Sequence, residues 1–454
     1  MYCKMIACAL GASCLCTPAF AQACDPTEVA DFNVPGLFGW TIAMGDGIAV
    51  IGAPEDSSFG SRAGAVYVYR DTSSGWVYQA VLTSSDIESN DLFGETVAIY
   101  GETILVGVPG DDDHGSRSGS AYIFDFDGAS WNQTTKLTAS DAGGTDAFGS
   151  ALAIVGTTAV IGATRNDELG TNAGAAYIFE LANGAWTESA RLLASDGEEY
   201  DAFGVSIALT DTFVVVGAAE DDDHGNSSGS VYVFTNDGAQ WTEQSKITPM
   251  DGSASDFFGE SIAASGNRII AGAYWDDDTG SNSGSAYIYE FDTKSGWNQQ
   301  AKLIAPDGNT QDQFGVAVSI SGDTVIVGAN RDDVIGSNTG SAYMYQFNDG
   351  QWALSSQLFG SQVLEEDEFG EKVALWGSVA AITSGDEVGR VYLYELGCSC
   401  PADFTGDGVL NFFDVSAFLQ AFTTQDPAAD FTGDGNFDFF DIGQFIGLFG
   451  AGCP

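Results

Sequence analysis

The sequence predicts a mainly β protein, a seven-bladed β-propeller followed by a small α-helical domain at the C-terminus. Three observations lead to this fold class. A unit of about 55 residues recurs seven times, and each complete unit contains four candidate strands. Residues 398–454 then leave the repeat and contain two similar segments, each a loop followed by a short helix.

The composition is that of an acidic, folded protein. The chain of 454 residues has 14 Lys and Arg against 64 Asp and Glu, a formal net charge of −50. This charge excludes nucleic acid as a partner, because phosphate binding requires many lysines and arginines, and it disfavours anionic membranes. With 44% hydrophobic residues the chain can bury a large core, and its 58 glycines fit many tight turns.

Residues 1–23 predict a secretory signal peptide. Lys4 provides a basic start, residues 5–16 are apolar, and Ala21-Gln22-Ala23 is a typical cleavage site. We therefore expect a secreted or cell-surface protein, with lipidation of Cys24 as the alternative. No later apolar run is long enough to cross a bilayer, so we expect no membrane span, and we expect a monomer.

The repeat is marked by a Phe-Gly pair at the start of each unit. Successive pairs are 55 residues apart, with one interval of 56. A tryptophan follows the first six pairs at a nearly constant offset, and we expect these rings to pack between blades; a carbohydrate platform is the alternative. The seven phenylalanines are Phe38, Phe93, Phe148, Phe203, Phe258, Phe314 and Phe369, and the six tryptophans are Trp76, Trp131, Trp186, Trp241, Trp297 and Trp352.

Each complete unit contains four predicted strands. In the third unit they cover residues 151–155, 159–163, 175–180 and 186–193. The third strand of every unit carries two aromatic residues two positions apart, such as Tyr177 and Phe179. A period of two places both rings on one sheet face, where they can pack against the neighbouring sheet.

The seventh unit predicts how the ring closes. Pro401 stands near the place where its tryptophan is expected, so this unit lacks a fourth strand. Asp31 precedes Phe38 by seven residues, as Asp86 precedes Phe93. Residues 24–31 therefore align with the end of a fourth strand and are predicted to complete blade seven.

These repeats resemble a known family. The Phe-Gly starts, Gly52-Ala53-Pro54, Gly107-Val108-Pro109 and the Gly-Ser-Ala-Tyr start of the third strand look like FG-GAP repeats, the blades of the integrin α-chain propeller, over about residues 32–397. The resemblance implies a propeller domain at residues 24–397 and a role in recognition or adhesion. A protein or a glycan is the expected ligand on the propeller face.

Acidic loops connect the second and third strands of several units. Clustered carboxylates repel one another unless they are solvated or bridged by a cation such as Ca²⁺. The resemblance suggests Ca²⁺ in these loops, and a solvated acidic rim is the alternative. The candidate residues are Asp111, Asp112, Asp113, Asp221, Asp222, Asp223, Asp276, Asp277 and Asp278.

No catalytic constellation stands out in the sequence. The two histidines, His114 and His224, occupy equivalent acidic loops, which favours a loop role over that of a catalytic base. We therefore expect a protein that is not an enzyme.

Residues 398–454 contain two calcium-loop patterns 27 residues apart. Oxygen-bearing residues at loop positions 1, 3, 5, 9 and 12 and glycine at position 6 follow the EF-hand order. Each loop precedes an amphipathic helix, with apolar Val415, Phe418, Leu419 and Phe422, then Ile442, Phe445, Ile446 and Phe449.

One helix per loop, with Asp at position 12, resembles a type I dockerin. The resemblance implies these Ca²⁺ ligands: Asp403, Thr405, Asp407, Val409, Asn411 and Asp414, then Asp430, Thr432, Asp434, Asn436, Asp438 and Asp441. It also implies that positions 10 and 11, Phe412-Phe413 and Phe439-Phe440, face a cohesin-like partner. The alternative is that these rings staple the small domain together.

Four cysteines remain after the signal peptide, namely Cys24, Cys398, Cys400 and Cys453. An even number in an exported protein suggests two disulfides. Cys24 could bridge Cys398 or Cys400, and a Cys400–Cys453 bond would fasten the ends of the C-terminal domain. The expected function is extracellular or cell-surface recognition or adhesion by an exported, non-catalytic, calcium-binding propeller, with a dockerin-like module for docking or anchoring. The alternative is a component or enzyme of extracellular polysaccharide breakdown that is attached through the dockerin-like domain.

Overall fold

The computed structural model describes residues 26–33, 39–238, 240–385, 389–396, 402, 404, 412–424, 429, 431 and 436–451. Two compact units divide the chain, and one of them comprises Pro26–Leu396. The expected signal peptide and Cys24, Cys398, Cys400 and Cys453 lie outside the described residues.

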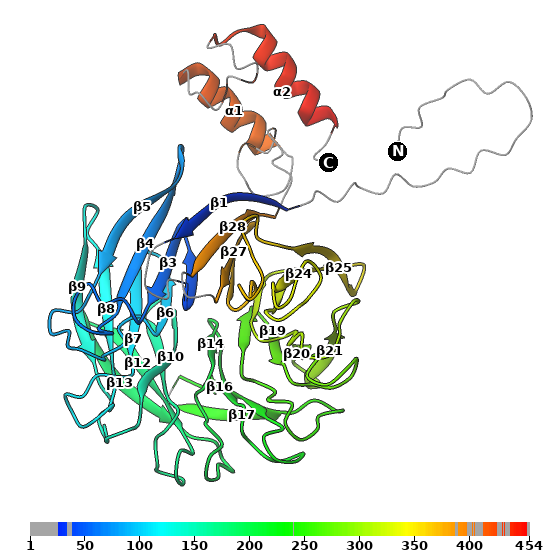
Figure 1. Ribbon diagram of the computed structural model, residues 1–454. Helices are drawn as coiled ribbons and strands as arrows, with labels where there is room; N and C mark the ends of the chain where they lie inside the picture. Colours follow the sequence, from blue (N-terminus) through cyan, green and yellow to red (C-terminus); the bar gives the residue numbers. More distant parts are fainter. Residues whose placement is uncertain are drawn as a thin grey trace, which may run out of the picture. The chain divides into compact units, whose positions relative to one another are not determined.

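Seven antiparallel sheets of four strands form the Pro26–Leu396 unit, as counted over the described residues. They stand around a common centre as the blades of a propeller (Figure 1). Blades one to six each use four consecutive strands, from the innermost to the outermost, so the predicted fold class is confirmed for this unit.

The first three blades contain β2 (Thr41–Gly45), β3 (Ile48–Ala53), β4 (Ala65–Thr72) and β5 (Gly75–Leu82); β6 (Thr96–Tyr100), β7 (Thr103–Val108), β8 (Ser120–Phe126) and β9 (Trp131–Leu137); and β10 (Phe148–Val155), β11 (Thr158–Ala163), β12 (Ala175–Ala182) and β13 (Ala185–Leu192). The next three contain β14 (Ile207–Leu209), β15 (Phe213–Ala218), β16 (Ser230–Asn236) and β17 (Trp241–Ile247); β18 (Ile262–Ser265), β19 (Arg268–Ala273), β20 (Ser285–Asp292) and β21 (Gly296–Leu303); and β22 (Val318–Ser321), β23 (Thr324–Ala329), β24 (Ser341–Asn348) and β25 (Gln351–Leu358).

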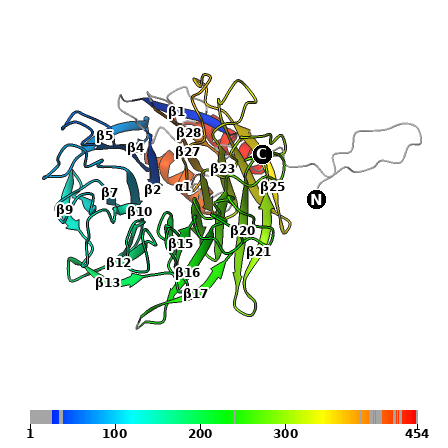
Figure 2. The same ribbon diagram turned by 60° about the horizontal axis from the view of Figure 1, so that its bottom comes forward.

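Blade seven is assembled from both ends of the propeller. It contains β26 (Val373–Trp376), β27 (Val379–Ser384) and β28 (Arg390–Glu395), and β1 (Thr27–Asn33) is its outermost strand. Figures 1 and 2 both show β1 beside β28, with which it pairs in antiparallel register. The backbone N–H of Ser361 donates to Glu28 at 2.9 Å, as that of Ser140 donates to Glu188 in blade three at 2.8 Å. The predicted closure by the N-terminal segment is therefore confirmed.

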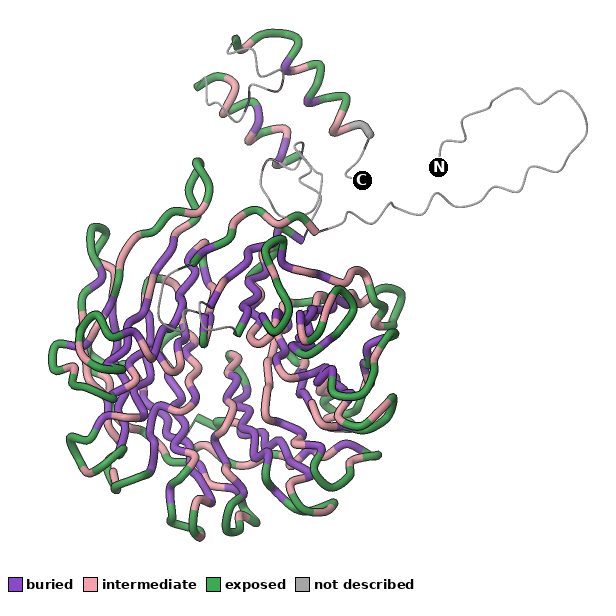
Figure 3. The backbone as a smooth tube through the Cα atoms, in the orientation of Figure 1, coloured by how far each residue is buried: buried purple, intermediate pink, exposed green. Residues whose placement is uncertain are grey.

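The cores of the propeller lie between adjacent blades. Phe148, Tyr177 and Phe179 of blade three join buried side chains of blade two, such as Ile123, in one cluster. The rings of Phe148 and Tyr177 meet edge to face at 5.5 Å. Trp186 packs against the same cluster, so the expected packing of the aromatic pairs and tryptophans between blades is confirmed. Figure 3 shows buried residues along the strands and exposed ones in the connecting loops.

Glycine at the blade junction explains the spacing of the repeat. Gly119, just before β8, forms a parallel bridge with Phe148 of the next blade. Its φ is +83°, and a Cβ atom here would lie 2.1 Å from the carbonyl oxygen of Phe148. Only glycine combines a positive φ with such a close approach to a neighbouring backbone. The Phe-Gly pair and the loop glycine of the preceding unit therefore form one contact between two blades.

The described residues after Leu396 include two helices, α1 (Phe412–Thr424) and α2 (Phe439–Ala451). Phe418 and Phe445 stack at 4.0 Å in a core that also contains Ala402 and Ala429. Leu419 and Ile446, which were expected on the packed faces, are 49% and 59% exposed. The other predicted apolar residues, Val415, Phe422, Ile442 and Phe449, pack against this core, and a tandem EF-hand domain stays a prediction.

Three aromatic residues in the first turns of these helices do not staple the domain. Phe412, Phe439 and Phe440 are 76%, 79% and 72% exposed. The stapling interpretation is therefore wrong for these three rings, because they contact water instead of the core. The side chain of Phe413 lies outside the described residues.

Candidate ligand site at the mouth of the central channel

A cavity of about 720 Å³ opens where the innermost strands begin, and side chains from all seven blades line it. The residue that follows each Phe-Gly pair contributes to this cavity. These residues are Trp40, Glu95, Ser150, Val205, Glu260, Val316 and Glu371. Their chemistry differs from blade to blade although the Phe-Gly pair before them repeats. This end of the channel therefore departs from sevenfold symmetry.

Aromatic side chains stand on two sides of the cavity. Trp40 is 46% exposed. Tyr274 and Trp275, which follow β19, also line the cavity. The Trp275 ring lies 4.9 Å from that of Phe257 and 5.7 Å from that of Tyr274, so the three rings support one another. Such faces can pack against the apolar face of a ligand.

Several polar atoms at the mouth have no bonding partner among the described residues. The buried Oδ1 of Asn330 and the buried Nε1 of Trp275 make no hydrogen bond. No side-chain bond of Glu95 or Glu260 to a described residue is present. Burial raises the pKa of both carboxyl groups above the usual value.

The basic residues of the mouth lie on the side of blades six and seven. Lys372 Nζ lies 3.4 Å from Glu371, and Arg331 Nε lies 3.5 Å from Glu368. The amide nitrogen of Asn330 donates to Glu371 at 2.5 Å. The acidic groups on this side therefore have basic partners, whereas Glu95, near Arg62 and Arg117, and Glu260 make no side-chain hydrogen bond to a described residue.

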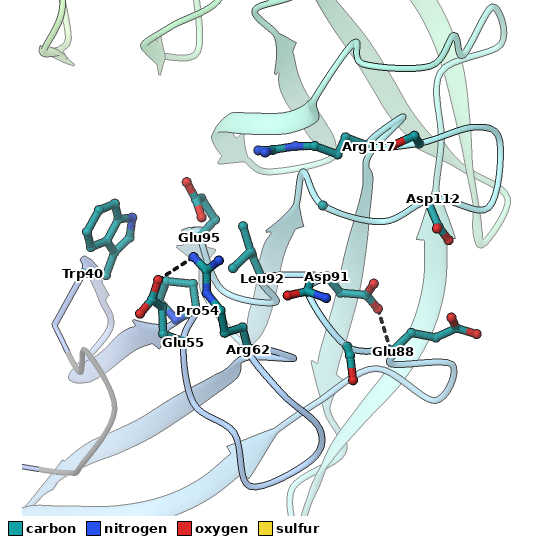
Figure 4. Close-up of a pocket in the computed structure, with 14 residues that line it drawn as sticks. Trp40, Pro54, Glu55, Arg62, Glu88, Asp91, Leu92, Glu95, Asp112 and Arg117 are labelled. Atoms are coloured by element: carbon teal, nitrogen blue, oxygen red, sulfur yellow. Dashed lines mark hydrogen bonds and ion pairs between the residues drawn. The ribbon is translucent and has the colours of Figure 1, made fainter.

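A second cavity of about 480 Å³ continues from the mouth between blades one and two. It shares Trp40 and Glu95 with the first. Figure 4 shows Glu55 and Arg62 paired near Trp40, with Arg117 on another loop. The Arg62–Glu55 distance is 2.5 Å. The two cavities together can accommodate an elongated ligand.

Sequence reasoning missed this site. Its residues lie far apart in the chain and belong to no motif. The available signal was the position after each Phe-Gly pair, where side-chain type varies while its neighbours repeat. Departure from the symmetry of a repeat protein is a mark of function, because the fold alone requires no such variation.

The acidic loops lie at the same end of the blades. The first aspartate of each triplet, Asp111, Asp221 or Asp276, is buried, and the second is exposed. The first and third converge on a lysine of the outermost strand. Among the described residues, no group of three or more His, Cys, Asp or Glu side chains is arranged to hold a metal ion.

Four of the expected C-terminal calcium ligands fall within the described residues. Asp414 and Asp441 are fully buried in the first turns of α1 and α2. Asp438 caps α2, since its Oδ1 accepts the N–H of Phe440 at 2.8 Å, and its own N–H donates to Asp441. Asn436 precedes this cap. The other expected ligands, Asp403, Thr405, Asp407, Val409, Asn411, Asp430, Thr432 and Asp434, lie outside the described residues.

Comparisons with known proteins identify one family. No curated protein sequence matches the chain. The solved structure titled "Crystal structure of the Saccharomyces cerevisiae Sqt1" is similar over 82% of this chain and 99% of its own, with a TM-score of 0.43 and 11% identity. No helix among the described residues has the length and apolar character required to cross a membrane.

The FG-GAP repeat matches six segments, residues 31–69, 76–124, 131–179, 186–234, 241–289 and 297–345. Each ends at the second aromatic residue of a third strand, and together they cover more than half of the chain. An FG-GAP propeller suggests recognition or adhesion of the extracellular type. The chain belongs to the FG-GAP repeat family.

Proposed function

We propose that this protein is an exported recognition protein, not an enzyme, and that its propeller binds a glycan at the mouth of the central channel. The observation that carries the proposal is the combination of exposed aromatic rings with both unmatched donors and unmatched acceptors. Trp275 offers an N–H, whereas Asn330, Glu95 and Glu260 offer oxygens.

A sugar fits this combination of groups. Each hydroxyl both donates and accepts hydrogen bonds, so one ligand can satisfy the indole N–H and the carboxylates together. The C–H face of a sugar ring can pack on Trp40 or Trp275. A polyanion fits poorly, because the formal net charge is −50.

The C-terminal unit is proposed to dock the protein to a cohesin-like partner. Phe412, Phe439 and Phe440, at the dockerin contact positions, are all exposed. The buried carboxyl groups of Asp414 and Asp441 are hard oxygen ligands suited to Ca²⁺, which would stabilise the loops before the two helices. A component of extracellular polysaccharide breakdown is the second candidate function, and the exposed phenylalanines favour it.

Calorimetry on the mature chain with cellohexaose, xylohexaose and chitohexaose tests the proposed glycan site. We expect at least one sugar to bind, and Trp40→Ala and Trp275→Ala to weaken binding by about tenfold or more. Trp376→Ala is the matched control, because Trp376 is 39% exposed and lies at the opposite end of an innermost strand. This control is expected to bind the sugar normally.

Two results would overturn the glycan proposal. One is the absence of binding by all three sugars, and the other is equal binding by the Trp40, Trp275 and Trp376 variants. Release of reducing ends from any of these sugars would contradict the non-catalytic part of the proposal while leaving the binding site in place.

A further inference from the structure

A lysine of the outermost strand contacts three aspartates in each of three blades. In blade four, Lys246 Nζ lies 2.9 Å from Asp196, 2.8 Å from Asp221 and 2.7 Å from Asp223. Asp196 follows the outermost strand of blade three, so this lysine also joins two blades. Equivalent trios surround Lys136 (Asp86, Asp111, Asp113) and Lys302 (Asp251, Asp276, Asp278), at 2.6–2.9 Å.

The ammonium group satisfies these carboxylates without a metal. Its three N–H donors match three carboxylates. The buried Asp221 also accepts bonds from Tyr232 at 2.8 Å and Ser230 at 3.0 Å. Burial alone would lower the pKa of Lys246, but its bonds to the three aspartates raise this pKa well above the usual value, so the lysine stays charged. A calcium ion, which requires six to eight oxygens at about 2.4 Å, would have to displace it.

The repeats themselves link the lysine to the acidic loop. In each of six blades, one residue of the outermost strand pairs with the first tyrosine of the third strand. We compare this residue with the third residue of the loop between the second and third strands, counting the buried residue of the loop as the first. An acidic third residue always accompanies a cation: Asp113 with Lys136, Glu168 with Arg191, Asp223 with Lys246 and Asp278 with Lys302. Neutral third residues accompany neutral partners: Ser58 with Val81 and Val334 with Gln357.

Blades three and six show what decides the charge at this position. Arg191 pairs with Asp141, and it lies 2.5 Å from Glu168. In blade six, the neutral amide of Gln357 donates to Asp332 at 3.2 Å and to Asp307 at 3.3 Å. Each of these two residues faces two carboxylates, so the charge at the outermost strand follows the third residue of the loop, Glu168 in blade three and Val334 in blade six.

We propose that Lys136, Lys246, Lys302 and Arg191 are the resident cations of the acidic loops, in the place that calcium would take in the FG-GAP resemblance, so that the propeller is stable without metal. The carboxylates of these loops fit an ammonium or guanidinium group, and the expected loop calcium is not needed to hold them together. Calcium in the chain would then be confined to the C-terminal loops.

Tryptophan fluorescence separates the two parts of the chain. All nine tryptophans lie between Trp40 and Trp376, so their emission reports the propeller and not the C-terminal unit. Thermal unfolding of the mature full-length chain is followed by this signal in excess EDTA and in millimolar CaCl₂. We expect the same melting temperature in both; a clear rise with calcium would overturn the proposal.

Lys246→Met tests the role of the ammonium group directly. We expect its fluorescence melting temperature to fall by several degrees in EDTA, and calcium to recover part of this loss, because three carboxylates then face one another without a cation. Lys246→Arg keeps the charge and is expected to remain insensitive to calcium. Lys294→Met, in an exposed turn without an ion pair among the described residues, controls for loss of a lysine. A Lys246→Met propeller that melts like this control, or that ignores calcium, would overturn the proposal.

Discussion

An aspartate lies two residues before six of the seven Phe-Gly pairs, and burial raises the pKa of five of these aspartates. Asp201 is 5% exposed, and its carboxylate accepts the N–H of Glu198 at 2.7 Å. Burial, followed by the nearby charge of Asp221, raises its pKa to about 6 despite this bond. Asp256 and Asp312 are raised to about 6 for the same reasons.

These three aspartates predict a stability that falls as the pH rises from about 4 to about 6. The folded chain keeps their protons up to about pH 6, whereas the unfolded chain releases them near 3.8. The folded state thus binds more protons across this window, and the free energy of unfolding decreases as they leave. We expect Asp201→Asn to reduce the difference in this free energy between pH 5 and pH 7 by about 1–2 kcal/mol.

Urea denaturation at the two pH values, followed by tryptophan fluorescence, measures this difference. Asp211→Asn, in an exposed turn, removes the same charge and serves as the control. A difference that is equal in the parent, Asp201→Asn and Asp211→Asn would show that Asp201 titrates normally in the folded chain.

Residue-level chemistry was only partly open to prediction. The acidic triplets were visible as a pattern, but the sequence did not show that only the first and third aspartates face a common cation. Their lysine partners were missed because Lys246 lies 23 residues or more along the chain from each aspartate it contacts. The pairing of loop and strand charges within the repeats was the signal that could have revealed them.

The outermost strand of each of the first six blades carries a β-bulge, and in blades one, four and five the bulge residue is a glutamine that contacts the next blade. In blade one, Val68 pairs with Ala80 and Tyr69 with Tyr78, which leaves Gln79 unpaired. The side chain of Gln79 accepts the indole N–H of Trp131 in blade two at 3.0 Å. Gln244 and Gln300 likewise accept the indole N–H groups of Trp297 and Trp352, at 3.2 and 2.9 Å respectively. The bulge redirects a side chain that a regular strand would hold elsewhere.

Blade three lacks this acceptor, which predicts a stabilising substitution. Its bulge residue is Ser189, and the indole N–H of Trp241 in blade four is buried without a partner. Ser189→Gln places an amide oxygen at the position that Gln244 uses in the next blade. We expect the free energy of unfolding to rise by about 1 kcal/mol, because a buried donor gains its bond.

A double-mutant cycle in urea checks the mechanism. Trp241→Phe removes the N–H while keeping an aromatic ring, so Ser189→Gln should bring no gain in that background. An equal gain with and without the indole N–H would assign the effect to strand propensity instead of the hydrogen bond.

Strands were predictable and bulges were not, for a physical reason. The four strands of the third unit agree with the prediction within a few residues, since alternating apolar side chains and glycine turns mark them locally. A bulge depends on the register between two strands, and Ser189 carries no local sign of it. The exposure of Leu419 and Ile446 was missed similarly, because helical periodicity identifies a face but not its partner.

At the scale of the whole propeller, β1 joins the two ends of the chain into one ring. It pairs with β28 over Thr27–Asn33, and Phe32 stacks on Tyr69 of blade one at 3.9 Å. Blade seven without β1 would expose the edge of β28 and lose a contact to blade one. Closure in propellers removes such edges, which otherwise favour association with other chains.

Deletion of residues 24–33 is therefore expected to lower the melting temperature of the propeller and to promote association at the open edge. A synthetic peptide covering residues 26–33, added in excess, should restore part of the lost stability in a concentration-dependent way, because it binds only the folded chain. Fluorescence melting and sedimentation velocity measure the two effects. Cys24→Ser in the full-length chain separates loss of the strand from loss of the expected disulfide, and a scrambled peptide controls for sequence-independent binding. If the deletion variant has the same melting temperature as Cys24→Ser and the peptide has no effect, β1 contributes little to closure. The packing of the innermost strands would then hold the ring closed.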